Sequence, residues 1–135
     1  MSASHRFEES DELRLVIRAD SFPEAAVEAG RALAEMAGAA APVEESGSWA
    51  EVSVEAADRA ALLVDWINEL IFRAESEGWL GADFEVVECS STRLRVKARR
   101  LGWPSRSLPV KAATLDRARV VDDPGGVTAE VTLDL

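Results

Sequence analysis

The sequence predicts an α+β fold, in which two helices pack on an antiparallel or mixed β-sheet and residues 1–135 form a single domain. Three observations support this prediction. The chain has 135 residues, 47% hydrophobic and 30% charged, which is typical of one folded core. Two helical patterns lie before residue 79, and the residues after it read as consecutive strands separated by short turns.

The chain opens with a strand pattern followed by a helix pattern. Residues 13–19 form an apolar run with β-branched residues at its centre, which predicts a strand. Ser21 and Glu24 have the spacing of a capping box, with Pro23 in the first turn. An apolar stripe at spacings of three and four then continues to Gly38, which predicts a core-facing helix.

The second helix pattern is apolar around most of its circumference, so it should lie deep in the domain. It follows a strand-like alternation over residues 49–55; Asp58 is placed to cap it and Gly78 to end it. Five of its side chains are assigned to the core: Trp66, Ile67, Leu70, Ile71 and Phe72. Asn68 lies among them, and because a buried amide needs hydrogen-bond partners, we expect it to bond a neighbouring strand or loop.

The second half of the chain contains four strand-like runs, at residues 84–89, 92–99, 110–121 and 127–133. Ser90 and Ser91 separate the first two runs, which is compatible with a tight hairpin. The segment Asp-Asp-Pro-Gly-Gly at residues 122–126 is a stronger turn signal. Consecutive strands joined by short turns favour antiparallel pairing.

Composition excludes several classes of protein. The single cysteine, Cys89, allows neither an internal disulfide nor a thiolate metal cage, which is typical of a cytoplasmic chain. No apolar run approaches the roughly 20 residues that cross a bilayer, and no signal-peptide core is present, so we expect no membrane association. The only histidine, His5, lies near a terminus that we expect to be mobile, which argues against histidine-based catalysis and imidazole-rich zinc sites.

Charge is distributed unevenly along the chain. The formal net charge is −10, which argues against a surface that binds nucleic acid throughout. Residues 93–119 carry nine basic residues and one acid, Asp116, a net charge of +8 that leaves −18 for the rest. Such polarity orients a protein toward a charged partner.

Carboxylates at two places in the sequence form the first candidate site. If the last strand pairs beside the strand at residues 13–19, Glu12, Asp134 and the terminal carboxylate of Leu135 converge, with Glu9 and Asp11 as possible further ligands. Like charges that close need a cation, and carboxylates suit hard ions such as Ca²⁺, Mg²⁺ or Mn²⁺. The alternative is that these acids form an ordinary solvated surface.

A basic strand forms the second candidate site. The period of two along a strand places four cations on one face: Arg93, Arg95, Lys97 and Arg99. Such a face needs anions, supplied either by a phosphate or anionic partner or by acids of the protein itself. Trp103 lies nearby, either as a stacking platform for a base or as a partly buried side chain.

The second helix pattern also carries a resemblance to a known family. Residues 62–72 read Leu-Leu-Val-Asp-Trp-Ile-Asn-Glu-Leu-Ile-Phe, which resembles the signature helix of the archease family. The helix start at residues 20–26, the segment Val-Lys-Ala-Ala-Thr-Leu at residues 110–115 and the final Asp134 and Leu135 are similar to family features in the same order. The resemblance therefore spans nearly the whole chain.

The resemblance implies a non-catalytic protein cofactor of the GTP-dependent RNA-splicing ligase, which acts in tRNA splicing. Such a cofactor promotes guanylylation of the ligase and multiple turnover through a carboxylate metal site. Carried over by position, Asp134 and Leu135 match the C-terminal ligands of the family, and Glu12 stands where the final Asp of a family motif belongs. Direct contact with RNA is left open.

Two departures from the family pattern define the alternative function. The family motif Asp-His-Thr-Ala-Asp is replaced by acids and a serine at residues 9–12, and the histidine that usually follows Thr-Tyr is replaced by Asp116. The alternative is a binding module that kept the fold without activating a ligase and that binds an anionic ligand or protein through the basic strand.

Overall fold

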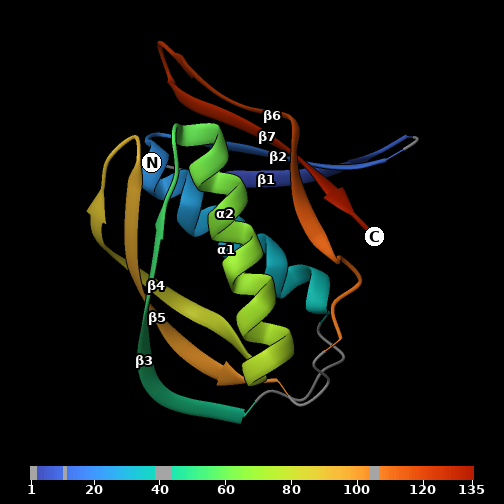
Figure 1. Cartoon of the computed structure of the whole chain (residues 1–135), viewed down its shortest axis with the longest axis vertical. Coiled ribbons are helices and arrows are strands. Elements are labelled where there is room, and N and C mark those ends of the chain that lie inside the picture. Colours follow the sequence, from blue (N-terminus) through green and yellow to red (C-terminus); the bar gives the residue numbers. More distant parts are fainter. Residues whose placement is uncertain (1–2, 11, 39–43, 104–106) are drawn as a thin grey trace.

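The structure is a computed structural model that describes residues 3–10, 12–38, 44–103 and 107–135, with the side chains of residues 44–47 left aside (Figure 1). Its elements, in chain order, are β1 (Ser4–Glu9), β2 (Leu13–Ala19), α1 (Phe22–Ala37), β3 (Glu44–Glu55), α2 (Arg59–Phe72), a π-helical turn (Arg73–Glu77), β4 (Trp79–Cys89), β5 (Arg93–Gly102), β6 (Ala112–Asp123) and β7 (Gly126–Asp134). None of the described helices is both long and apolar enough to cross a membrane.

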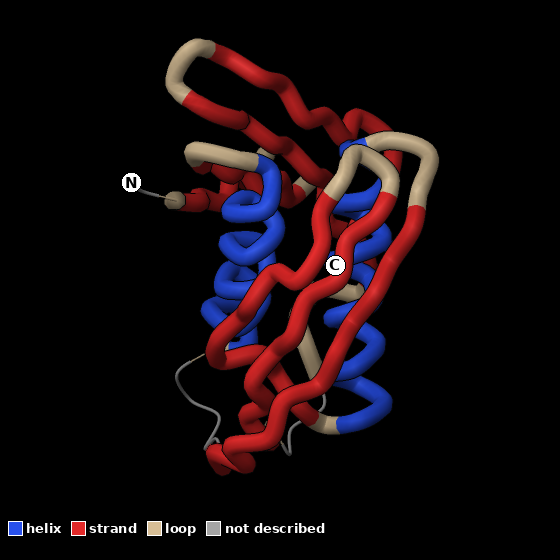
Figure 2. The backbone as a smooth tube through the Cα atoms, turned by 90° about the vertical axis from the view of Figure 1, so that its left-hand side faces the viewer, coloured by secondary structure: helices blue, strands red, loops and turns tan. Residues whose placement is uncertain are grey.

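Two antiparallel sheets flank the helices. One sheet has the order β1-β2-β7-β6 and the other the order β3-β5-β4, and every pairing described is antiparallel. Helix α1 contacts β2 and β4, and helix α2 contacts β6 and β3, so each helix touches both sheets. In Figure 2 the three-stranded sheet faces the viewer, with the helices behind it. The α+β prediction of two helices on antiparallel strands is confirmed.

Helix α1 begins and packs as the sequence predicts. The Ser21 hydroxyl accepts a hydrogen bond from the backbone N–H of Glu24 at 3.4 Å, and the helix ends at Gly38 with a positive φ of 85°. Its apolar stripe is buried at Phe22, Ala25, Ala26, Ala29 and Leu33.

Helix α2 is buried on most of its surface, with one correction. Asp58 accepts a hydrogen bond from the N–H of Ala61 at 2.9 Å, and the indole N–H of Trp66 donates to the carbonyl of Ala26 at 2.8 Å, which ties α2 to α1. The assignment of Phe72 to the core is wrong, because its side chain is 55% exposed. Phe72 follows Asp65 by two helical turns and therefore lies on the solvent face of α2.

The strand predictions hold for most elements, but the first strand is missed. The terminus around His5, which the sequence predicts to be mobile, instead forms β1 and pairs with β2 along the whole length of that strand. As an edge strand it turns only one face inward, with His5 and Phe7 half-buried, so its apolar signal is weak. Strand β4 also begins earlier than predicted, because Gly78, with φ 73° and ψ 36°, leads straight into Trp79.

Phe84 joins the helix layer to the three-stranded sheet. Its ring lies where side chains at Gly30 of α1 and Gly81 of β4 would otherwise be, so a methyl group at either glycine would overlap the ring. The ring also meets Trp66 edge-on, with centroids 6.2 Å apart. Glycine at both positions is therefore a packing requirement.

Candidate functional site

The pairing of β2 with β7 brings the predicted acidic residues to one end of the four-stranded sheet. Leu13 lies opposite Leu133, so Glu12 and Asp134 occupy neighbouring strand ends. Strand β6 lies on the other side of β7, with Ala112 opposite Asp134. The N–H of Lys111 donates to the Asp134 carbonyl at 2.7 Å. The condition on which the acidic site was based, that the last strand pairs beside residues 13–19, is met.

A small hollow lies at this end of the sheet. It has a volume of about 200 Å³ and is lined by Glu9, Ser10, Glu12, Leu13 and Leu135. The N–H of Ser10 donates to the Glu12 carbonyl at 3.1 Å, which links two residues of the lining to each other. Three of the predicted ligands therefore share one surface, whereas Asp11 lies outside the described residues.

Arginines already contact the Glu12 carboxylate. Arg117 Nη1 donates to Glu12 Oε1 at 3.2 Å, and Arg14 Nη2 lies 3.9 Å from the same oxygen. In the part of the chain that the structure describes, no three His, Cys, Asp or Glu side chains are grouped closely enough to hold a metal ion. The Glu12 carboxylate is thus neutralised by arginines of the protein itself. The carboxylate oxygens at this edge are nevertheless of the class that binds hard divalent cations.

An irregularity in β6 brings Arg117 to Glu12. Thr114 pairs with Thr132 and Arg119 with Glu130, so residues 115–118 of β6 lie opposite the single residue that separates Thr132 from Glu130 on β7. Arg117 has φ 63°, the positive φ that non-glycine residues rarely adopt. Sequence reasoning missed this bulge, because neither a glycine nor an asparagine marks it.

Asn68 fixes β6 to helix α2. Its Nδ2 donates to the Ala113 carbonyl at 3.0 Å, and its Oδ1 accepts from the Ala113 N–H at 2.7 Å. The side-chain amide thereby satisfies the backbone N–H and carbonyl of Ala113, as a further paired strand would. The expectation that Asn68 bonds a neighbouring strand is confirmed. Because Ala113 pairs with Leu133, this link also positions the strand end that carries Asp134.

Acids from the neighbouring strands cover most of the predicted basic face. Arg95 pairs with Glu51 at 2.9 Å and with Glu88 at 3.2 Å, so it bridges β3 and β4. Further ion pairs join Arg93 to Glu55 at 3.6 Å and Arg99 to Asp83 at 2.7 Å. This arrangement favours the interpretation that the basic strand is neutralised within the protein.

Two further residues of this region, Lys97 and Trp103, differ in their exposure to solvent. Lys97 makes no ion pair with a described residue and lines a hollow of about 500 Å³ with Trp49, Glu51 and Glu85. Trp103 is only 1% exposed, so of its two alternatives the buried side chain holds and the stacking platform for a base does not. The indole packs in the hydrophobic core, although Trp103 directly follows the basic strand in the sequence.

His5 is held between two glutamates of α1. Its Nδ1 lies 2.5 Å from Glu28 Oε2, and its Nε2 lies 2.6 Å from Glu35 Oε2. Burial of the ring lowers the pKa of His5, but the hydrogen bonds to Glu28 and Glu35 and the charges of both acids outweigh burial, so the net pKa is raised. The expectation of a mobile terminus at His5 is wrong, because these contacts join β1 to α1.

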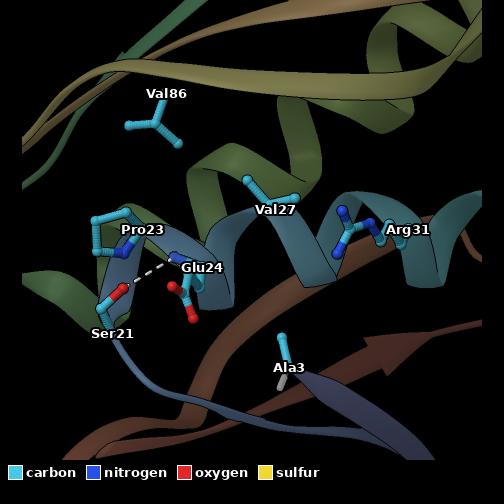
Figure 3. Close-up of a pocket in the computed structure, with 7 residues that line it drawn as sticks. All are labelled: Ala3, Ser21, Pro23, Glu24, Val27, Arg31 and Val86. Atoms are coloured by element: carbon cyan, nitrogen blue, oxygen red, sulfur yellow. Dashed lines mark hydrogen bonds between the residues drawn. The ribbon is translucent and has the colours of Figure 1, made fainter. Parts of the chain in front are cut away.

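A cavity of about 420 Å³ opens beside the start of α1 (Figure 3). Pro23, Val27 and Val86 give it apolar walls, while Glu24 and Arg31 are polar members of its lining. Glu24 Oε2 is buried and has no hydrogen-bond partner among the residues that the structure describes. No local sequence pattern marks this cavity, because its walls come from Ala3, the start of α1 and β4, which are far apart along the chain.

The model of the Archease protein family matches residues 7–135, a span that includes the α2 helix, Glu12 and the chain end. The chain belongs to the archease family. The resemblance seen in the α2 sequence is therefore confirmed, and the match covers all the strands except the first part of β1.

Two curated archeases are similar to the chain. Protein archease of Methanopyrus kandleri is 34% identical over 127 residues, which cover 87% of this chain and 88% of that protein. Protein archease of Methanothermobacter thermautotrophicus is 30% identical over 97 residues, which cover 67% of this chain and 69% of that protein. Both matches cover two thirds or more of the archease concerned.

A solved archease has the same fold. The crystal structure of an archease from Thermotoga maritima, described as a possible chaperone, matches with a TM-score of 0.65 and covers 98% of this chain and 100% of that one. The two sequences are 19% identical, so this likeness concerns the fold. The two-helix, antiparallel architecture is that of an archease.

Proposed function

We propose that this archease is a non-catalytic activator of a GTP-dependent RNA-splicing ligase in the cytoplasm. It promotes guanylylation and multiple turnover of the ligase through a divalent-cation site at Glu12, Asp134 and the Leu135 carboxylate. Membership of the archease family supports the role as a partner of another protein. The observation that carries the site is the β2–β7 register, which places Glu12 and Asp134 at adjoining strand ends.

The donors at this edge suit a hard cation in their chemistry, and binding one would draw them together, because no three described His, Cys, Asp or Glu side chains are grouped that closely. All the donors are carboxylate oxygens, the class that Ca²⁺, Mg²⁺ and Mn²⁺ take. Glu12 is partly exposed and Asp134 and Leu135 are exposed, so the edge is open to a partner. Glu9 is a further donor beside the same hollow.

The protein contributes an oriented acidic edge. Strand pairing fixes the backbone of Asp134 and of Leu13, the residue after Glu12, and Asn68 holds β6 against the same end of the sheet through Ala113. A bound cation would neutralise phosphate charge when the edge meets the nucleotide site of the ligase. This role requires a protein partner, and it requires no general base in this chain.

A multiple-turnover RNA ligation assay tests this proposal. The ligase from the same source is supplied with GTP and Mn²⁺, with and without a substoichiometric amount of this protein. We expect product beyond one turnover only when the protein is present, and we expect Asp134→Ala to remove the gain. Asp65→Ala is the matched control, because Asp65 is an exposed acid on α2 and not at this edge.

The outcomes separate the parts of the proposal. No gain with the native protein and an active ligase would contradict ligase activation. An equal gain with the native protein and with Asp134→Ala would support ligase activation but show that the acidic site plays no part in it.

A further inference from the structure

Arg117 lies in a position that regular strand pairing would not provide. The bulge at residues 115–118 turns it to a φ of 63°, and its guanidinium donates to Glu12 Oε1 at 3.2 Å. The two residues are 105 positions apart in the sequence. A positive φ at a residue with a side chain is unfavourable, so surrounding contacts must hold it, and the contact with Glu12 is one of them.

Arg119 shows what the bulge changes. Only two residues further along β6, it is back in register with β7 and pairs with Glu130 at 3.1 Å. The side chains of Arg117 and Arg119 are 66% and 64% exposed, so their access to solvent is nearly the same. They differ in their acidic partner, which is Glu12 for Arg117 and Glu130 for Arg119. Arg119 is therefore a close match for Arg117 in charge, exposure and strand, but without the contact to Glu12.

Arg14 is a weaker partner of the same carboxylate. Its Nη2 lies 3.9 Å from Glu12 Oε1, and its Nη1 lies 3.9 Å from Glu130 Oε1, so its charge is shared between two acids. Arg117 is the nearer cation and makes a hydrogen bond, so it dominates the positive charge at Glu12.

We propose that Arg117 is an internal counter-ion that competes with divalent cations for Glu12. This inference rests on the proposed function, because it describes how the cation site there is controlled. The guanidinium takes up an oxygen that a cation would use and repels a second positive charge at the same place. Cation binding at the acidic edge therefore displaces Arg117 from Glu12.

Calorimetric titration with Ca²⁺ and Mn²⁺ tests this competition. The full chain is compared with Arg117→Gln, Arg119→Gln, Glu12→Gln and the double variant that combines Arg117→Gln with Glu12→Gln. We expect Arg117→Gln to bind the cation about ten-fold more tightly than the native chain, whereas Arg119→Gln should bind as the native chain does. In the Glu12→Gln background, loss of Arg117 should have little further effect.

The outcomes distinguish this inference from the proposed function. Cation binding that is equally tight in the native chain and in Arg117→Gln would overturn the competition and leave the metal site standing. A gain of the same size in Arg119→Gln would also overturn it, because general charge would then explain the effect. Absence of binding in every protein would overturn both proposals. If Arg117→Gln fails to fold, Arg117→Gly, which suits the positive φ, replaces it.

Discussion

At the scale of single residues, His5 has the most unexpected environment. It lies on the edge strand β1, yet both ring nitrogens meet carboxylates of α1, at 2.5 Å for Glu28 and 2.6 Å for Glu35. Glu28 is nearly buried, and Arg31 also pairs with it at 3.4 Å. A protonated imidazole satisfies both glutamates at once, because both of its nitrogens then donate.

This contact predicts a pH dependence of stability. The pKa of His5 in the folded chain is raised above 6.5 by Glu28 and Glu35 against the opposing effect of burial. The stabilisation is therefore fully present below pH 6.5 and is lost as the pH rises through the folded pKa. We expect the melting temperature of the native chain to fall as the pH rises from 6.5 through the raised pKa of His5.

His5→Asn provides the comparison for this prediction. Its melting temperature should be lower than that of the native chain at the acidic end of the range and should change less with pH. Parallel pH profiles for the two proteins would show that the His5 contact contributes no pH-dependent stability.

At the scale of elements, charge complementarity arises between strands that are distant in the sequence. The basic run in β5 lies between β3 and β4, whose acids pair with it, so a segment that is strongly basic in the sequence is largely neutral in the sheet. The hairpin of β6 and β7 is held to the body in the same manner, by bidentate pairs of Arg18 with Asp123 and of Arg59 with Asp122.

The link between α2 and β6 supports a mutational prediction at this scale. Asn68→Leu removes both hydrogen bonds to Ala113 and leaves its N–H and carbonyl without partners. We expect the free energy of unfolding to fall by roughly 2 to 4 kcal/mol in urea denaturation. Glu69→Gln on the same helix is the control; it weakens only a partly exposed ion pair with Arg73 and should cost less than about 1 kcal/mol. Equal losses in both variants would refute a special role for Asn68.

At the scale of the whole molecule, close packing joins the two sheets through the helices. Phe84 of β4 fills space left by Gly30 of α1 and meets Trp66 of α2, so one ring connects three elements. The core is continuous across both sheets, with Leu15 and Ile17 on one side and Val52 and Val96 on the other. Changes at this junction should affect the stability of the entire domain.

Gly30→Ala tests this junction. Alanine favours a helix by about 1 kcal/mol over glycine, but its methyl group overlaps the Phe84 ring. We expect a net loss of roughly 1 to 3 kcal/mol in the free energy of unfolding. Phe84→Leu should lower the free energy of unfolding less in the Gly30→Ala background than in the native chain. An increase in stability from Gly30→Ala alone would contradict the overlap.

The sequence by itself determined the elements whose signals are local. Ser21, Asp58 and Gly78 mark helix ends because their contacts involve residues within a few positions along the chain. The neighbouring placement of Glu12 and Asp134 could be stated from the sequence only on the condition that the last strand pairs beside β2, and the structure meets that condition.

The tertiary structure alone decided the rest. Arg117 meets Glu12 across 105 residues, and His5 meets Glu35 across 30, through side-chain contacts that no local pattern encodes. Phe72 was misassigned because hydrophobicity alone does not reveal which face of a helix its neighbours leave uncovered. Local propensity sets where helices and strands begin and end, whereas ion pairing and exposure depend on how distant segments pack together.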